Sequence, residues 1–163
     1  MDRHSLRDWV GGYERAWRTP DGPELDRALA ELFAAGATYL TAPFERPFEG
    51  LPAITQMWKA GRQGPDEPFT MAAEIIAADP QQRVGVVRVE VRYGAPPGLV
   101  YRDLWILHFD AADKCAAFEE WPFWPPGSRG SYQRGPELPH TEEKIPSASE
   151  QAAEGVHLGH VAQ

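Results

Sequence analysis

The sequence predicts an α+β domain in which three helices precede a curved, mostly antiparallel sheet. Up to about residue 62, apolar residues recur at the spacing of amphipathic helices. From Phe69 to Trp121 they follow extended, strand-like runs instead, and the breaks between these runs are short, as in an antiparallel meander. A helical first half followed by such a meander is typical of α+β architecture.

The first helix is expected over residues 5–18, and a second begins at Asp21-Gly22-Pro23, because proline in a first helical turn gives up no hydrogen bond. Ser5 followed by Asp8 resembles a capping box at the start of the first helix. Gly36 is placed to end the second. Their expected buried residues are Leu6, Trp9, Val10, Tyr13 and Trp17 in the first helix and Leu25, Leu29, Leu32 and Phe33 in the second.

A short strand is expected at 37–41, an irregular loop at 42–50 and a third helix at 51–62. The meander follows as four strands. Pro122 and Pro125 cannot donate to a sheet ladder, so the last strand must end there or become an edge. The four strands are expected at 69–78, 83–93, 99–109 and 114–121.

Length and composition are those of one domain that ends near residue 125. After Pro125 the chain is rich in Pro, Gly, Ser and Glu, so residues 126–163 are expected to form a flexible tail.

The net charge of −8 argues against nucleic acid and anionic lipid as partners. Without an apolar run long enough to cross a bilayer, the protein is expected to be cytoplasmic. Cys115 is the single cysteine, which excludes an intramolecular disulfide.

Three stretches of the sequence carry a family resemblance. They run from Leu32 to Tyr39 and on through Phe48-Glu49-Gly50-Leu51-Pro52-Ala53-Ile54, from Tyr101 to Trp105, and from Phe109 to Trp121. They resemble the cone-shaped, nuclear-transport-factor-two-like (SnoaL-like) superfamily, which includes ketosteroid isomerase and limonene epoxide hydrolase. The resemblance covers about residues 5–124 and implies a sheet wrapped around the first helix, an apolar cavity and a homodimer through the outer sheet face. The same cone houses isomerases, hydrolases, cyclases and binding modules, so the resemblance leaves the chemistry open.

Comparison with ketosteroid isomerase places Tyr13 at the position of that family's oxyanion-binding tyrosine. The position of the catalytic base is occupied by Thr41, and that of the second acid by Trp105. Because threonine cannot abstract a proton from carbon at neutral pH, steroid-type isomerisation is not expected.

Comparison with limonene epoxide hydrolase selects Arg88, Glu90 and Glu120 as candidate catalytic residues. Arg88, Glu90 and Arg92 share one face of their strand, and an arginine between two carboxylates could hold one ionised and the other protonated. This hypothesis requires the charged face to look into the cone. The alternative is a cross-strand ion-pair ladder on a solvated face.

The leading prediction is a domain that binds a small apolar molecule, with no metal and no cofactor. A cofactor-independent epoxide hydrolase or lyase using Arg88, Glu90 and Glu120 is the alternative, and a protein-interaction module using the Trp-rich segment 121–124 is a third possibility. Aromatic side chains with a few polar groups are typical of small-molecule pockets. The predicted ligand-binding residues are Tyr13, Trp17, Tyr39, Trp58, Asp103, Trp105 and Phe118.

Overall fold

The computed structural model describes residues 1–94 and 98–125, which form three helices and a six-stranded sheet. The α+β class expected from the sequence is confirmed. The predicted flexible tail, 126–163, lies outside the described residues. The helices are α1 (Arg3–Trp17), α2 (Pro23–Leu32) and α3 (Leu51–Gly61); the strands are β1 (Phe33–Leu40), β2 (Phe48–Glu49), β3 (Phe69–Asp79), β4 (Val84–Tyr93), β5 (Leu99–Phe109) and β6 (Cys115–Phe123).

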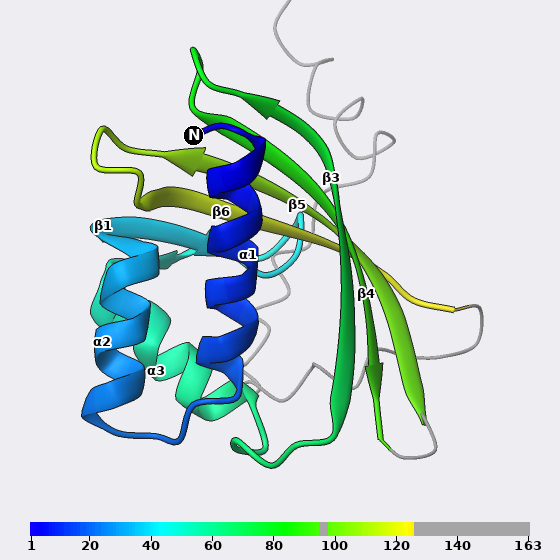
Figure 1. Ribbon diagram of the computed structural model, residues 1–163. Helices are drawn as coiled ribbons and strands as arrows, with labels where there is room; N and C mark the ends of the chain where they lie inside the picture. The colour runs from blue at the N-terminus through cyan, green and yellow to red at the C-terminus, as the bar shows by residue number, and fades with distance from the viewer. Residues whose placement is uncertain (95–97, 126–163) are drawn as a thin grey trace, which may run out of the picture. The chain divides into compact units, whose positions relative to one another are not determined.

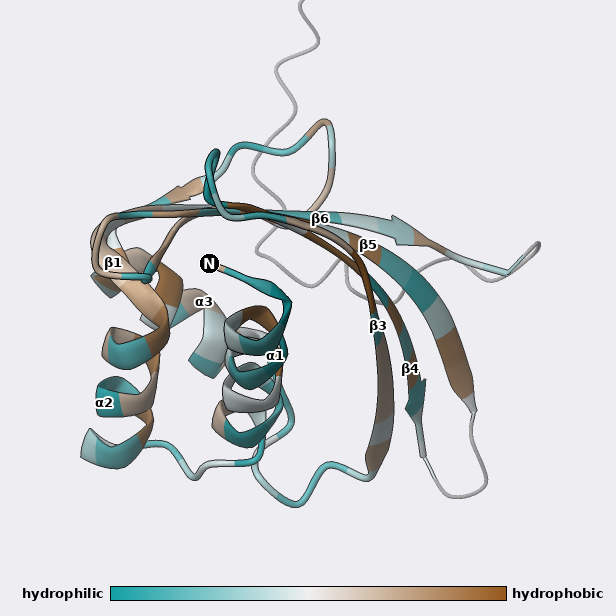
Figure 2. Ribbon diagram, turned by 45° about the horizontal axis from the view of Figure 1, so that its top comes forward, coloured by the Kyte–Doolittle hydropathy of each residue, from teal (hydrophilic) through white to brown (hydrophobic). Residues whose placement is uncertain are grey.

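The strands are ordered β2-β1-β6-β5-β4-β3, and every neighbouring pair is antiparallel except β1 and β6, which run parallel. The sheet curves over the helices, with α1 against its concave face (Figure 1). Figure 2 shows the same layering from another side, with hydrophobic residues along the strands that curve over α1. The parallel contact joins the first half of the chain to its last strand.

Helix α1 packs so closely on the sheet that one strand position excludes a side chain. A Cβ added at Gly85 on β4 would lie 2.7 Å from Leu6 Cδ2 of α1. Leu6 is fully buried, and a real Cβ does not approach another carbon so closely. Glycine at this position therefore allows α1 to settle into the concave face of the sheet.

Buried Arg62, directly after α3, ties that helix to the end of α1. Its guanidinium donates to the carbonyl oxygens of Ala16 and Trp17 at 3.2 and 2.8 Å, and it pairs with Asp21 in the connection to α2. The Arg62 side chain is 1% exposed. It therefore gives a partner to the Trp17 carbonyl oxygen at the end of α1 and a further donor to that of Ala16, which also accepts the Thr19 N–H at 3.0 Å.

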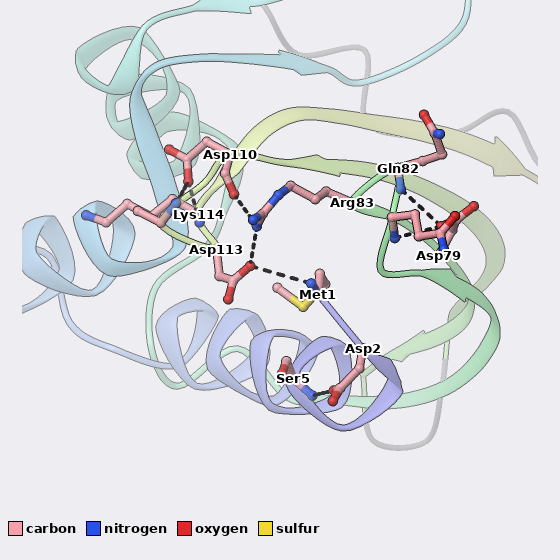
Figure 3. A network of polar contacts seen from close by, with 11 residues as sticks. Met1, Asp2, Ser5, Asp79, Gln82, Arg83, Asp110, Asp113 and Lys114 are labelled. Atoms are coloured by element: carbon pink, nitrogen blue, oxygen red, sulfur yellow. Dashed lines mark hydrogen bonds and ion pairs between the residues drawn. The ribbon is translucent and has the colours of Figure 1, made fainter.

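A polar network joins two hairpin turns to the first residue of the chain (Figure 3). Arg83 donates to the Asp110 carbonyl oxygen and to the Asp113 carboxylate, both at 3.0 Å. The Met1 amino group lies 3.5 Å from the same Asp113 carboxylate. The Asp110 carboxylate accepts the Lys114 backbone N–H at 3.0 Å and so closes its turn. The network holds the ends of β4, β5 and β6 beside the start of α1.

Four details differ from the sequence-based expectations. The N-cap of α1 is Asp2, whose carboxylate accepts the Ser5 N–H at 2.8 Å, so the capping box starting at Ser5 is wrong. Helix α2 ends at Leu32, and Gly36 lies inside β1, where the pairing with β6 is irregular. The loop expected at 42–50 contains the short strand β2.

The fourth difference concerns β6, which continues through Pro122 to Phe123. Strand β1 pairs with β6 only as far as Glu119, whereas β5 pairs with it as far as Phe123. At Pro122, β6 therefore has a partner strand on one side only, which is where a residue without an N–H is tolerated.

Candidate functional site

Strands β5 and β6 place two carboxyl groups on the inner face of the sheet. On β5, Asp103 and Trp105 are buried at alternate positions. Asp103 pairs with Pro122, and Trp105 pairs with Glu120 of β6, so these side chains share a face. Phe118, 1% exposed, precedes Glu120 by two residues on the same face. Because side chains alternate between the two faces of β6, Glu120 lies on the face that contacts the aromatic interior.

The Glu120 carboxylate meets two tyrosine hydroxyls from separate elements. Tyr39 of β1 donates to Glu120 Oε1 at 2.7 Å, and Tyr13 of α1 donates to the same oxygen at 3.3 Å. The two hydroxyl oxygens lie 2.7 Å apart. Both tyrosines are buried, whereas Glu120 keeps partial access to solvent. The three groups form a compact acid–hydroxyl cluster. Its side chains come from α1, β1 and β6.

The environment raises the pKa of Glu120 well above the ordinary value of a glutamate. Loss of hydration is the main cause, and the nearby charge of Asp103 acts in the same direction, while the two tyrosine hydrogen bonds oppose the shift. The pKa of Tyr39 is also raised, by its burial and then by Glu120 and Tyr13. Tyr39 therefore remains a hydrogen-bond donor, and Glu120 binds its proton more strongly than an exposed glutamate does.

Asp103 is a second buried carboxyl group, 3% exposed. Burial raises its pKa to about 6, against hydrogen bonds from the Trp105 side chain and from the Trp121 and Leu104 backbone. The Trp105 indole donates to Asp103 Oδ2 at 2.9 Å. The interior thus contains two carboxyl groups whose charges disfavour each other.

Tyr13 lies at the centre of the aromatic side chains beside this cluster. Its ring centroid lies 4.7 Å from that of Trp58, 4.6 Å from that of Trp105 and 5.7 Å from that of Phe118. Trp17 stacks nearly parallel to Tyr13 at 6.4 Å and lies 4.9 Å from Trp58. These rings pack against one another around Tyr13, beside Glu120.

Two recesses open on the described surface away from the aromatic cluster. One, of about 370 Å³, lies between α1 and β3 and is lined partly by Arg3, Arg7 and Glu74. The other, of about 630 Å³, lies between α1 and α2. Neither is lined by Glu120, Tyr39 or Asp103.

The structure does not bring the three predicted catalytic residues together. On β4, Val87, Val89 and Val91 are buried, so the alternating residues Arg88 and Glu90 lie on the outer face. The expectation that the charged face looks into the cone is therefore wrong. The physical reason is that the aromatic interior accepts the valines, whereas the arginines stay in water.

On the outer face, the charged residues pair with neighbouring strands. Arg88 donates to Glu74 of β3 at 2.8 Å. Glu90 accepts from Arg92 at 2.6 Å and from Arg102 of β5 at 3.0 Å, and these bonds lower its pKa. The Arg88–Glu74 and Arg102–Glu90 pairs form the cross-strand ladder considered as the alternative, whereas the Arg92–Glu90 pair lies within β4.

All seven predicted ligand-binding residues lie in the interior, and Glu120 joins them. Their role as ligand contacts stays a prediction. The direct contact of Glu120 with Tyr39 and Tyr13 was missed, although one signal was available: Glu120 stands two residues after Phe118, and so shares its face. Buried Arg62 was also missed, because two of its partners are backbone carbonyl groups that carry no sequence signal and the third, Asp21, is distant in the sequence.

Within residues 1–94 and 98–125, no three His, Cys, Asp or Glu side chains are grouped so that they could hold a metal ion.

The predicted Trp-rich segment 121–124 lies in two different environments. Trp121 and Phe123 are 36% and 61% exposed, and Trp124 packs on Tyr101 with ring centroids 4.8 Å apart. In the same described part of the chain, no helix combines the length and apolar character needed to span a bilayer.

Solved structures share this fold at low sequence identity. An NTF-2-like protein of unknown function from Burkholderia xenovorans matches 80% of this chain and 91% of its own, with a TM-score of 0.57 and 13% identity. A protein of the SnoaL-like family from Agrobacterium tumefaciens covers 74% of this chain and 98% of its own, with a TM-score of 0.59 and 16% identity. A steroid delta-isomerase from Pseudomonas aeruginosa covers 74% and 77%, with a TM-score of 0.50 and 19% identity.

No protein-family model and no curated protein matches the sequence. The structural similarities establish the fold, which is that of the SnoaL-like and NTF-2-like structures. The fold implied by the sequence resemblance is thereby confirmed.

Proposed function

We propose that this SnoaL-like chain binds a small, largely apolar molecule with an oxygen function in its interior, and that Glu120 exchanges a proton with that molecule. The observation that carries the proposal is the Glu120 carboxylate held by two tyrosine hydroxyls beside an aromatic cluster. Aromatic walls would bind the apolar body of the ligand, and the polar cluster would orient its oxygen.

The raised pKa of Glu120 makes its carboxylate a stronger base than that of an exposed glutamate. A general acid or base works best when its pKa lies close to the working pH, because it then gives and takes the proton with similar ease. Tyr39 and Tyr13 each have one hydroxyl proton, so they would turn from Glu120 to donate to negative charge developing on the ligand oxygen. Bound in this way, a ketone would lose a proton from the adjacent carbon to Glu120 and be held as its enolate.

The fold similarity to a steroid delta-isomerase supports this reaction class. The known chemistry of ketosteroid isomerase combines a carboxylate base with a tyrosine and a protonated aspartate around the ligand oxygen. Here Glu120 on β6 would supply the carboxyl group that Thr41 cannot, and Asp103 would be the second acid. The proposal concerns the reaction class, and it leaves the substrate skeleton open.

The test is α-proton exchange on bicyclic ketones such as α-tetralone in D₂O, followed by NMR. Glu120→Gln should slow the catalysed exchange by about 100-fold or more, the typical contribution of a general acid–base group. Glu90→Gln is the matched control, since Glu90 lies on the outer face, and it should leave exchange unchanged. Exchange at the wild-type rate in Glu120→Gln would refute the catalytic role.

A homodimer through the outer sheet face is a second part of the proposal. This face carries half-buried Val86, Leu104 and Ile106 together with exposed Trp121. The strand register makes them neighbours, because Val86 pairs with Ile106, and Leu104 with Trp121. Such an apolar area between charged pairs is suited to self-association or to another protein partner.

A further inference from the structure

Two adjacent tryptophans in the interior have indole N–H groups without an acceptor. Among the described residues, Trp17 Nε1 and Trp58 Nε1 are buried and make no hydrogen bond. Three other indoles do find acceptors: Trp9 donates to the Leu32 carbonyl oxygen at 3.0 Å, and Trp105 and Trp121 donate to carboxylates at 2.9 and 3.1 Å. Trp17 and Trp58 therefore differ from these three tryptophans.

A third unpaired donor lies next to them. Arg62 Nε is also buried without a hydrogen bond, although the other nitrogens of that side chain are bonded. Trp17 is adjacent to both other residues: its ring lies 4.9 Å from that of Trp58, and its backbone carbonyl oxygen accepts from Arg62 Nη1 at 2.8 Å. Arg62 also follows Trp58 by one helical turn at the end of α3.

Three unpaired donors at one junction carry an energetic cost. Each buried N–H without a partner destabilises the fold, so such groups usually have an acceptor or a functional reason. An acceptor that reached Trp17, Trp58 and Arg62 would recover part of this cost. The recovered free energy would then favour binding of the molecule that carries the acceptor.

We propose that the ligand of the interior carries a second oxygen, a neutral carbonyl group that accepts from Trp17 and Trp58 next to Arg62. This inference rests on the proposed binding function and names its ligand class: an apolar molecule oxygenated at two separate positions. One oxygen meets Glu120 and Tyr39, and the other meets the indole donors. Tyr13, whose ring contacts Trp58 and whose hydroxyl contacts Glu120, lies between the two positions.

The charge balance selects a neutral carbonyl over a carboxylate. The positive charge of Arg62 is already paired with Asp21, so it does not attract a further anion. Glu120 and Asp103 both have raised pKa values, and a ligand anion nearby would oppose their ionisation further. A ketone, ester or lactone oxygen accepts hydrogen bonds without adding charge.

Two probes of nearly equal shape isolate the second oxygen: 6-acetyl-2-naphthol and 6-isopropenyl-2-naphthol. Both present a hydroxyl to Glu120, but only the acetyl compound has a carbonyl acceptor at its far end. Titration followed by fluorescence should show about three- to tenfold tighter binding of the acetyl compound, as one net hydrogen bond provides. Trp58→Phe and Trp17→Phe should each reduce this ratio, while Trp121→Phe on the outer face should keep it.

A second readout uses the unmodified protein. In ¹H–¹⁵N spectra, the indole signals of Trp17 and Trp58 should shift with the acetyl compound and not with the isopropenyl compound. Equal affinity for both probes, or an unchanged ratio in the Trp17→Phe, Trp58→Phe double variant, overturns the inference and leaves the binding function intact. Failure of both probes to bind, with no spectral change, counts against the binding function and the inference together.

Discussion

At the scale of single residues, the interior keeps two carboxyl groups in surroundings that favour their neutral forms. Asp103 has a pKa of about 6 instead of 3.8, because burial removes water from its charged form. The folded protein therefore holds this proton over a pH range in which the unfolded chain has lost it. Folding stability must then depend on pH through this residue.

The contribution of Asp103 to the free energy of unfolding should be largest below about pH 4. It should fall as the pH rises to about 6. The expected loss is about 3 kcal/mol, since each unit of pKa difference corresponds to about 1.4 kcal/mol. In Asp103→Asn the amide oxygen can still accept from Trp105, but the free energy of unfolding should depend less on pH. Glu120, whose pKa is also raised, leaves a residual dependence of the same sign.

Urea unfolding between pH 4 and 8 measures this dependence, with Asp66→Asn as a control on an exposed aspartate. A slope in Asp103→Asn identical to that of the wild type would contradict the assignment. Sequence reasoning placed Asp103 in the interior but could not foresee its pKa, because the shift depends on how completely the aromatic neighbours exclude water.

At the scale of elements, α1 is held at its end by Arg62 and along its length by close packing on β4. Arg62→Met should remove three hydrogen bonds and lower the free energy of unfolding by about 2–3 kcal/mol, as expected for a charged donor to buried acceptors. Arg88→Met is the matched control, because its ion pair with Glu74 is exposed and contributes less than about 1 kcal/mol. Equal losses in the two variants would argue against the special role of Arg62.

The packing of α1 on β4 gives a second prediction at this scale. Gly85→Ala places a methyl group against Leu6 and should destabilise the protein by about 1–3 kcal/mol, the usual cost of overpacking. Gly36→Ala is the control, since a Cβ there meets nothing within 4 Å. Thermal unfolding compares the two variants, and a loss at Gly36 equal to that at Gly85 would show that contact with Leu6 is not the cause.

The elements themselves were largely predictable, and the errors have a common origin. Periodicity located three helices and four long strands, because a buried stripe and an alternating face leave clear patterns in the sequence. Gly36 and the loop at 42–50 were misassigned. The reason is that β1 pairs with β6, which is distant in the sequence, and with β2, which is very short. The orientation of Arg88 and Glu90 was wrong because alternation shows which residues share a face but not which face is inside.

At the scale of the whole molecule, the outer sheet face should determine the state of association. Ile106→Arg places a charge at the centre of the apolar area and should convert a dimer into a monomer, because burying an unpaired charge is costly. Phe44→Arg is the control, as Phe44 is fully exposed and lies outside the sheet. Light scattering after size exclusion gives the mass, and a wild-type monomer would refute the interface.

The parallel pairing of β1 with β6 also determines when the acid–hydroxyl cluster can form during synthesis. Tyr39 of β1 pairs with Phe118 of β6, so β1 cannot pair with β6 until most of the domain has been synthesised. Contacts between such distant positions slow folding, and unpaired strand edges promote aggregation meanwhile. A ribosome-bound chain that stops before β6 holds both tyrosines but lacks Glu120. The acid–hydroxyl cluster is therefore among the last parts of the domain that a growing chain can form.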